Sequence, residues 1–247
     1  MTKLSKNNVN RVISQWARLG AMFNVSASRQ DVDLERLLLD TTRHAAANSR
    51  LIILAVTWLA KYGQYVAKHR LAHLIRHELE KEHQATMGLM LDLAREKGTN
   101  NSHRFNQAIN ACAPADVQRP LLDVDQRNDF FVRTVRANAS ALSLKWGRWM
   151  EDFELKNDAI RPAQWIVKHN PAMRWRGDYK GDLRASILAE LDTNPDAASS
   201  ESALARTCGA TRTAVRDALR QLEMAGRVSQ QRQNNRNTIH PSLPTAA

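Results

Sequence analysis

The sequence predicts an all-α protein, in which an irregular multi-helix N-terminal domain is followed by a small C-terminal winged helix-turn-helix with a short β-hairpin wing. Between residues 7 and 168, apolar residues recur at the spacing of amphipathic helices, with few β-branched runs. After residue 182, three short helical patterns precede a segment with strand, turn and strand character. A chain of 247 residues has room for both domains.

The first two predicted helices lie near residues 9–19 and 31–46. In the first, "VNRVISQWARLGAMF" places five apolar side chains on one helical face: Val9, Val12, Ile13, Trp16 and Leu19. The second opens with acidic residues, which suit the positive end of a helix dipole. It then repeats leucine at positions 34, 37 and 38. Each helix is therefore expected to turn one face towards a core.

A long apolar segment at residues 49–83 predicts the centre of the N-terminal domain. Its first half is apolar nearly all round, as in a helix that is buried on every side. Ser49 is a residue type that caps helix N-termini. We therefore expect a central helix that begins at Ser49.

Five more helices are predicted, at residues 84–97, 102–111, 127–137, 142–155 and 162–168. Gly, Asn and Pro cluster between them, in "KGTNN", "CAPADVQRP", "KNDAIRP" and "HNP". Within 142–155, Trp146, Trp149 and Phe153 have the spacing of one helical face. That face suits core packing at least as well as a platform on which bases stack.

Helix-breaking residues and changes in charge along the chain predict the domain boundaries. An all-helical domain for partner binding or dimerisation covers 1–170, a basic junction 171–181, a DNA-binding domain 182–240 and a flexible tail 241–247. In the junction, "NPAMRWRGDYKG" combines Pro and Gly with Arg174, Arg176 and Lys180.

Charge favours a polyanionic partner. The chain has 36 Lys and Arg against 25 Asp and Glu, a formal net charge of +11. Nucleic acid is the leading candidate partner because it has the densest line of negative charge in a cell. A soluble protein that is merely basic remains an alternative.

The two cysteines, Cys112 and Cys208, lie in unlike contexts and suggest neither a disulfide framework nor a metal site. With no signal-peptide pattern and no apolar run long enough for a bilayer, we expect a cytoplasmic protein.

The C-terminal patterns follow one another closely. "DLRASILAELDTN" predicts a helix that ends at Asn194, and Ser200 can cap a second, short helix that stops at Gly209. Thr211 can cap a third helix, which Gly226 terminates. In that helix Val215, Leu219 and Leu222 recur on one face. The hairpin pattern "RVSQQRQNNRNTIH" comes last, which is the order of a winged helix-turn-helix.

The segment "ALARTCGATRTAVRDALRQLEMAGRV" resembles the winged-helix domain of GntR-type bacterial transcription regulators, and more distantly that of MarR-like regulators. The matching residues are Leu204 and Ala205, Gly209, Thr211-Arg212-Thr213, Arg216-Asp217-Ala218-Leu219, and Gly226. The likeness covers residues 182–240 and implies a DNA-binding module. In the GntR family this module normally comes first in the chain, whereas here it comes last, so only its DNA-binding character is carried over.

The expected DNA contacts divide between a recognition helix and a wing. The N-terminal end of the helix presents hydroxyls to phosphate and arginine to guanine O6 and N7: Thr211, Arg212, Thr213 and Arg216. Arg220, one turn later, suits a phosphate contact. The wing residues Arg232, Asn234, Asn235 and Arg236 suit phosphate or a minor groove. Double-stranded DNA and a homodimer that reads paired half-sites are therefore the expected partners, and no cofactor, metal or membrane is expected.

Three alternatives stay open. The winged helix could bind protein, with its arginines as a solvated face, or the chain could be a DNA-binding antitoxin or accessory protein of a toxin–antitoxin or phage-defence system. The third is catalytic, because "RLAHLIRHE", with Arg70 and His77, resembles the Arg-and-His motif of helical HEPN-type ribonucleases, although Leu71 replaces the usual polar residue. The histidines at 69, 73 and 77 could chelate a metal, but no H-E-x-x-H signature accompanies them. No convincing catalytic constellation is found, so we expect a protein that is not an enzyme.

Overall fold

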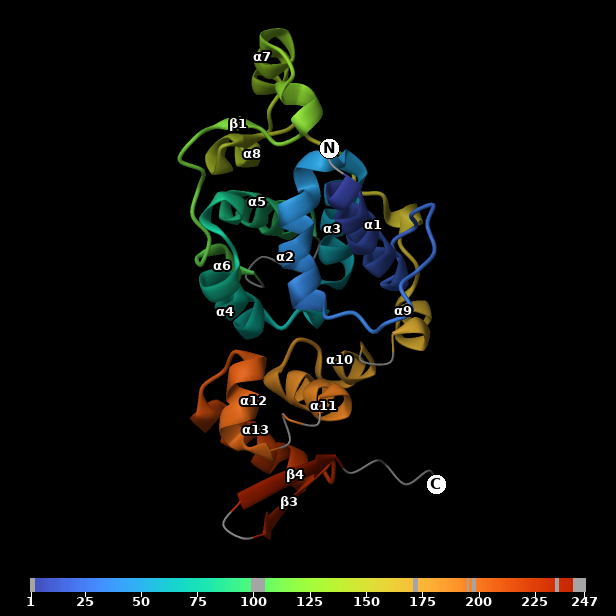
Figure 1. Ribbon diagram of the computed structural model, residues 1–247, viewed down its shortest axis with the longest axis vertical. Helices are drawn as coiled ribbons and strands as arrows, with labels where there is room; N and C mark the ends of the chain where they lie inside the picture. Colours follow the sequence, from blue (N-terminus) through green and yellow to red (C-terminus); the bar gives the residue numbers. More distant parts are fainter. Residues whose placement is uncertain are drawn as a thin grey trace. The chain divides into compact units, whose positions relative to one another are not determined.

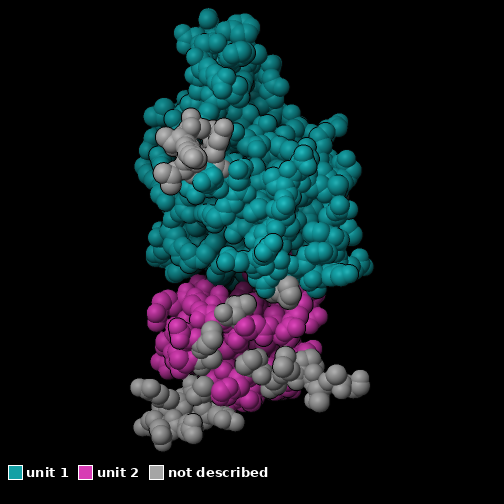
Figure 2. All heavy atoms as spheres, turned by 45° about the vertical axis from the view of Figure 1, so that its right-hand side comes forward, with its two compact units in different colours: residues 1–170 teal, residues 171–247 magenta. Residues whose placement is uncertain are grey.

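The structure, a computed structural model, describes residues 3–98, 105–170, 173–194, 196, 199–233 and 236–241. These residues are mostly helical and contain two small two-stranded sheets, which confirms the predicted fold class. The chain divides into two compact units, residues 1–170 and 171–247 (Figures 1 and 2).

The first unit is a helical assembly with one short parallel sheet. Its described α-helices are α1 (Lys3–Arg18), α2 (Leu34–His44), α3 (Ser49–Tyr62), α4 (Lys68–Glu78), α5 (Lys81–Lys97), α6 (Asn106–Ile109), α7 (Asp129–Ala137), α8 (Ala141–Trp146) and α9 (Ala163–His169). Four 3-10 turns lie between them: η1 (Ala45–Ala47), η2 (Gly63–Tyr65), η3 (Asp123–Gln126) and η4 (Asn157–Ala159). The sheet pairs β1 (Arg119–Pro120) with β2 (Arg148–Trp149).

Helix α3 lies at the centre of this unit, as its composition predicts. Nearly all its side chains are buried, and it packs against α2 and α5. Two buried tryptophans, Trp58 of α3 and Trp16 of α1, have their indole N–H groups hydrogen-bonded. Trp58 donates to the carbonyl of Leu19 at 2.9 Å, and Trp16 donates to the hydroxyl of Thr41 at 2.8 Å. The expected cap is wrong by one residue, because Asn48 rather than Ser49 accepts the hydrogen bond that begins the helix.

Two expected helices are shorter than their patterns suggest, and a glycine lies at the break in each case. The 49–83 segment breaks after Tyr62, where Phe105 packs so closely that a Cβ on Gly63 would lie 2.6 Å from its ring. The 142–155 helix ends at Trp146 because Gly147 takes the left-handed conformation, with φ of 66°. The following residues form β2, so Trp146, Trp149 and Phe153 do not share a helical face.

Boundary differences are smaller elsewhere. Helix α5 begins before the expected start at residue 84, and α6 is only four residues long within the predicted 102–111. Of that prediction, residues 102–104 lie outside the described part of the chain.

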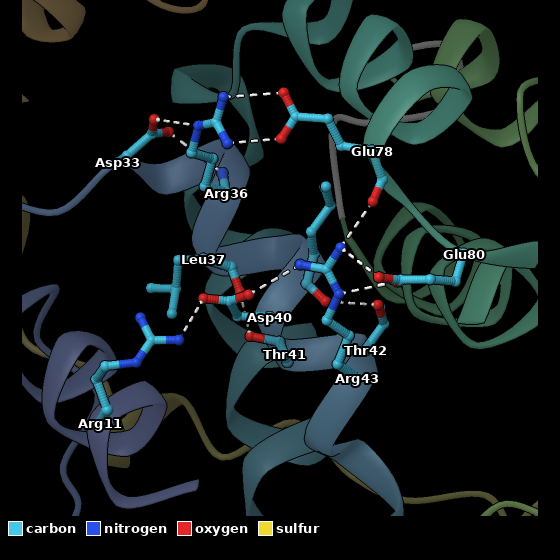
Figure 3. Close-up of polar contacts among 11 residues, drawn as sticks. Arg11, Asp33, Arg36, Leu37, Asp40, Thr41, Thr42, Arg43, Glu78 and Glu80 are labelled. Atoms are coloured by element: carbon cyan, nitrogen blue, oxygen red, sulfur yellow. Dashed lines mark hydrogen bonds and ion pairs between the residues drawn. The ribbon is translucent and has the colours of Figure 1, made fainter. Parts of the chain in front are cut away.

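Ion pairs join α2 to the elements on either side of it (Figure 3). They are Arg11–Asp40 at 2.8 Å, which reaches α1, and Arg36–Glu78 and Arg43–Glu80, which reach the end of α4 and the start of α5. Because these pairs are partly exposed, each contributes little to the free energy of unfolding.

The second unit has its own core. It comprises α10 (Arg174–Tyr179), α11 (Leu183–Thr193), α12 (Glu201–Cys208), α13 (Arg212–Met224) and the antiparallel strands β3 (Val228–Gln233) and β4 (Arg236–Pro241). The two predicted N-caps form, at Ser200 and Thr211, and Asp182, which was not predicted, caps α11 in the same way. The segment expected to be a junction instead contains α10, whose Trp175 is buried with the core of this unit. Of the expected tail at 241–247, only Pro241 is described.

Candidate nucleic-acid interface

Helix α13 has a buried rear face and an exposed N-terminal end. Its apolar residues Val215, Leu219 and Leu222 are fully buried and pack in the core of the second unit with α11 and α12. Thr211, before the first turn, caps the helix by accepting a hydrogen bond from the Ala214 amide at 3.2 Å. The rear face thus determines which residues of α13 face solvent.

All five expected recognition residues are exposed. Thr211, Arg212 and Thr213 stand at the first turn, Arg216 one turn later and Arg220 after it. The amide groups at the start of a helix and a nearby hydroxyl suit phosphate. Arg220 forms a long ion pair of 3.6 Å with Asp217, and both side chains are largely in solvent. The pair is therefore weak enough to be exchanged for a phosphate contact.

Glu201, which the sequence did not indicate as a site residue, binds the two central arginines. It opens α12, and its carboxylate lies 3.1 Å from Nε of Arg212 and 3.0 Å from a terminal nitrogen of Arg216. The Nε of Arg216 donates to its second oxygen at 3.3 Å. The Glu201 side chain is only 12% exposed, against 65% for Arg212 and 44% for Arg216. The guanidinium groups of both arginines therefore face solvent, while the carboxylate of Glu201 that binds them is largely buried.

The opposite charges in this cluster shift the pKa of Glu201 and of Arg216 in favour of their charged forms. The hydrogen bond from Arg216, followed by that from Arg212, lowers the pKa of Glu201 in spite of its partial desolvation. The same bond raises the pKa of Arg216. The pKa of the Glu201 carboxyl is lower in the folded state than in the unfolded state. The cluster therefore stabilises the fold at pH values above the ordinary pKa of glutamate, and this stabilisation is lost as the pH falls through the lowered pKa of the folded state.

The cluster leaves some of the guanidinium N–H donors without an acceptor among the described residues. A guanidinium has five N–H groups, and Arg212 uses only its Nε on Glu201. No described residue accepts a hydrogen bond from its terminal nitrogens, the end-on edge that matches guanine O6 and N7. Arg216 uses Nε and one terminal nitrogen, and its other terminal nitrogen has no described acceptor.

The predicted wing is present as a backbone hairpin, in which Gln233 pairs with Arg236. Arg232 and Arg236 lie in its two strands, but the side chains of both lie outside the described part of the structure. Asn234 and Asn235 lie wholly outside it.

Of the two residues of the ribonuclease-like motif, Arg70 belongs to a structural ion network and His77 lies on the surface of α4. Arg70 is 8% exposed and binds both oxygens of Asp33 at 2.6 Å and the fully buried Glu35 at 3.0 Å. His77, two turns along α4, is exposed, and its ring lies 4.4 Å from that of His73. Arg70 thus holds α4 to α2 through two carboxylates.

The described residues hold neither a metal-binding cluster nor a membrane span. Among them no group of three or more His, Cys, Asp or Glu is arranged to hold a metal ion. No helix in the described ranges has both the length and the apolar content to cross a bilayer.

Comparison with protein-family models, curated proteins and solved structures finds no match to this chain. The function of this protein is therefore inferred from its own residues, above all from the arginines of α13 and from Glu201.

Proposed function

We propose that the protein is a sequence-specific double-stranded DNA-binding protein that acts as a transcription regulator. One observation carries the proposal: two arginines stand exposed at the N-terminal end of the second helix of a helix-turn-helix, and a single carboxylate orients both. That end of the helix enters the major groove in proteins of this architecture.

In the proposed complex each part of the interface has a separate task. Arg212 and Arg216 read guanine through their outward nitrogens, while Thr211, Thr213 and Arg220 hold phosphate. Arg232, Asn234, Asn235 and Arg236 of the wing are proposed to touch the adjacent backbone or minor groove. The formal charge of +11 adds attraction that does not depend on sequence.

A homodimer completes the proposal, because two-fold symmetric proteins read paired half-sites. The first unit would then supply the contact between copies, and the second unit would supply the contact with DNA.

The test begins with selection of genomic fragments by the purified full chain at physiological salt. Dissociation constants are then measured for the selected site and for a scrambled duplex. We expect Arg212→Ala and Arg216→Ala each to weaken specific binding by about 1–3 kcal/mol, the value of one bidentate base contact. Arg184→Ala removes the same charge from α11 and should leave the ratio of specific to non-specific affinity unchanged. A folded double variant, Arg212→Ala with Arg216→Ala, that binds the selected site as tightly as the parent would overturn the proposal.

A further inference from the structure

The first unit contains a pocket of about 550 Å³ beside α1 and α9. Its walls come from α1, from the loop of residues 20–27, from the first turn of α3 and from residues 161–165, where α9 begins. In Figure 1 this loop follows α1 on the side of the unit where α9 lies. Pockets that bind small organic molecules measure roughly 300–1,000 Å³. The volume is therefore that of a site for a small molecule.

Apolar side chains form most of the lining of this pocket. They are Ile13, Met22, Phe23, Val25 and Trp165, with alanine and glycine between them. Met22 is 41% exposed and Val25 42%, although both are large apolar residues. A ligand that covers them removes apolar surface from water, which is favourable. The lining thus favours a ligand with an apolar body.

Backbone contacts hold the loop wall of the pocket in place. The Met22 amide donates to the carbonyl of Ala159 at 2.8 Å, and the Arg161 amide donates to the carbonyl of Gly20 at 2.8 Å. Gly20 has a left-handed φ of 87°, and a Cβ there would lie 2.9 Å from the Cβ of Arg161. Glycine allows both this conformation and this close approach. The wall is thus fixed by the protein's own backbone, which lowers the entropic cost of binding a ligand.

The charged side chains of the lining are two exposed arginines, Arg50 and Arg161. Arg50 donates one terminal nitrogen to the carbonyl of Met22 at 2.9 Å, and its guanidinium lies 5.9 Å from the ring centroid of Phe23. The guanidinium of Arg161 lies 5.9 Å from the ring centroid of Trp165. Among the described residues, no carboxylate forms an ion pair with either arginine. Both guanidinium groups therefore have donors for an anionic ligand.

These two arginines differ from others in the first half of the same unit. Several of those bind carboxylates of the chain itself: Arg11, Arg18, Arg36, Arg43 and Arg70. Arg50 and Arg161 instead line an apolar pocket, so an incoming carboxylate would meet no competing acid among the described lining residues.

We propose that this pocket binds a small apolar carboxylic acid. Its carboxylate pairs with the guanidinium groups of Arg50 and Arg161, and its apolar body covers Met22, Phe23 and Trp165. A sugar or a phosphate ester fits less well, because its further polar atoms would lie against apolar walls without hydrogen-bond partners. The inference goes beyond the proposed function, since it gives the first unit a ligand and does not depend on DNA binding.

The test is titration calorimetry of the full chain, without DNA, with phenylacetate, naphthylacetate, indoleacetate and decanoate. Each acid is compared with its own amide, which has nearly the same shape and no charge. We expect at least one acid to bind with a Kd of about 1 mM or lower, and its amide to bind at least about tenfold more weakly.

Three variants locate the site. Arg161→Ala should weaken binding of that acid about tenfold, because it removes a charged hydrogen-bond donor and leaves the backbone contacts of residue 161 in place. Ala17→Phe, in α1, places a ring in the pocket and should abolish binding. Arg76→Ala removes an exposed arginine of α4 that does not line the pocket, and it should bind the acid like the parent chain.

The outcomes separate the possibilities. The inference is overturned if no acid binds more tightly than its amide, or if folded Arg161→Ala binds the acid like the parent chain. Tighter binding of phenyl phosphate than of phenylacetate would overturn the assignment to carboxylic acids. Should Ala17→Phe fail to fold, Arg50→Ala is the second variant, with the same expected loss as Arg161→Ala. DNA selection is scored separately, so a chain that binds an acid but selects no DNA site contradicts the DNA proposal alone.

Discussion

A single carboxylate, that of Glu201, orients the two exposed arginines Arg212 and Arg216. Without Glu201, the long side chains of Arg212 and Arg216 would sample many rotamers, and each would lose that freedom on binding, at about 0.5–1.5 kcal/mol per side chain. Glu201 already holds both arginines in the structure, and under the proposed function this restriction precedes DNA binding. It also places a negative charge near the expected position of phosphate, which opposes binding that depends on charge alone.

These two effects predict the result of Glu201→Gln. The amide keeps the shape of the side chain but removes its charge, so affinity for a scrambled duplex should rise while the ratio of specific to non-specific affinity falls. Dissociation constants for both duplexes at two salt concentrations measure the change. Glu223→Gln, on the C-terminal part of α13, removes the same charge without touching either arginine. Equal ratios for the two variants would show that Glu201 does not position the arginines.

Arg70 illustrates a buried charge that serves the fold. Arg70→Ala would remove the cation beside the fully buried Glu35, and breaking a buried pair in this way costs about 3–5 kcal/mol. Arg76→Ala removes an exposed arginine of the same helix and should change the free energy of unfolding by less than about 0.5 kcal/mol. Urea denaturation measures both. Equal effects of the two substitutions would contradict the structural role of Arg70.

At the scale of elements, one glycine sets the contact between α5 and α8. Gly88 lies in the buried middle of α5, where a Cβ would overlap the indole ring of Trp146. Trp146 ends α8, which leads into β2, and β2 pairs with β1. The close approach of α5 and α8 therefore depends on the absence of a side chain at Gly88.

Gly88→Ala is accordingly expected to destabilise the first unit by about 1–3 kcal/mol, the usual cost of overpacking a core. Gly177 provides a matched control in α10, because nothing lies within 4 Å of the position of its Cβ. Gly177→Ala should stabilise the protein by up to about 1 kcal/mol, since alanine is the better helix former. Thermal unfolding of both variants is the measurement, and a neutral Gly88→Ala would show that Trp146 can move aside.

At the scale of the whole molecule, each compact unit has a separate apolar core. Calorimetry of the full chain should therefore show two transitions. Leu51→Ala, in α3, should lower the midpoint temperature of one transition only, and Leu219→Ala, in α13, that of the other only. Each substitution should reduce the free energy of unfolding of its own unit by about 2–5 kcal/mol. A single transition that both substitutions lower equally would show that the units unfold together.

The sequence by itself determined the features that depend on neighbours within a few turns. The buried face of α1, the buried face of α13 and the caps Ser200 and Thr211 are all as predicted. They can be predicted because helical periodicity and capping involve residues only a few positions apart. The order of three helices and a hairpin follows from the same local signals.

Only the tertiary structure decided the features that depend on packing between distant segments. The helix predicted over 49–83 breaks at Gly63, where the Phe105 ring leaves no room for a Cβ, and α7 carries an amphipathic pattern but no buried residue. Glu201 meets the arginines of α13 because α12 and α13 pack together. Local patterns indicate which residues can form a helix and which face is apolar, but the partner of that face depends on contacts between segments that lie far apart along the chain.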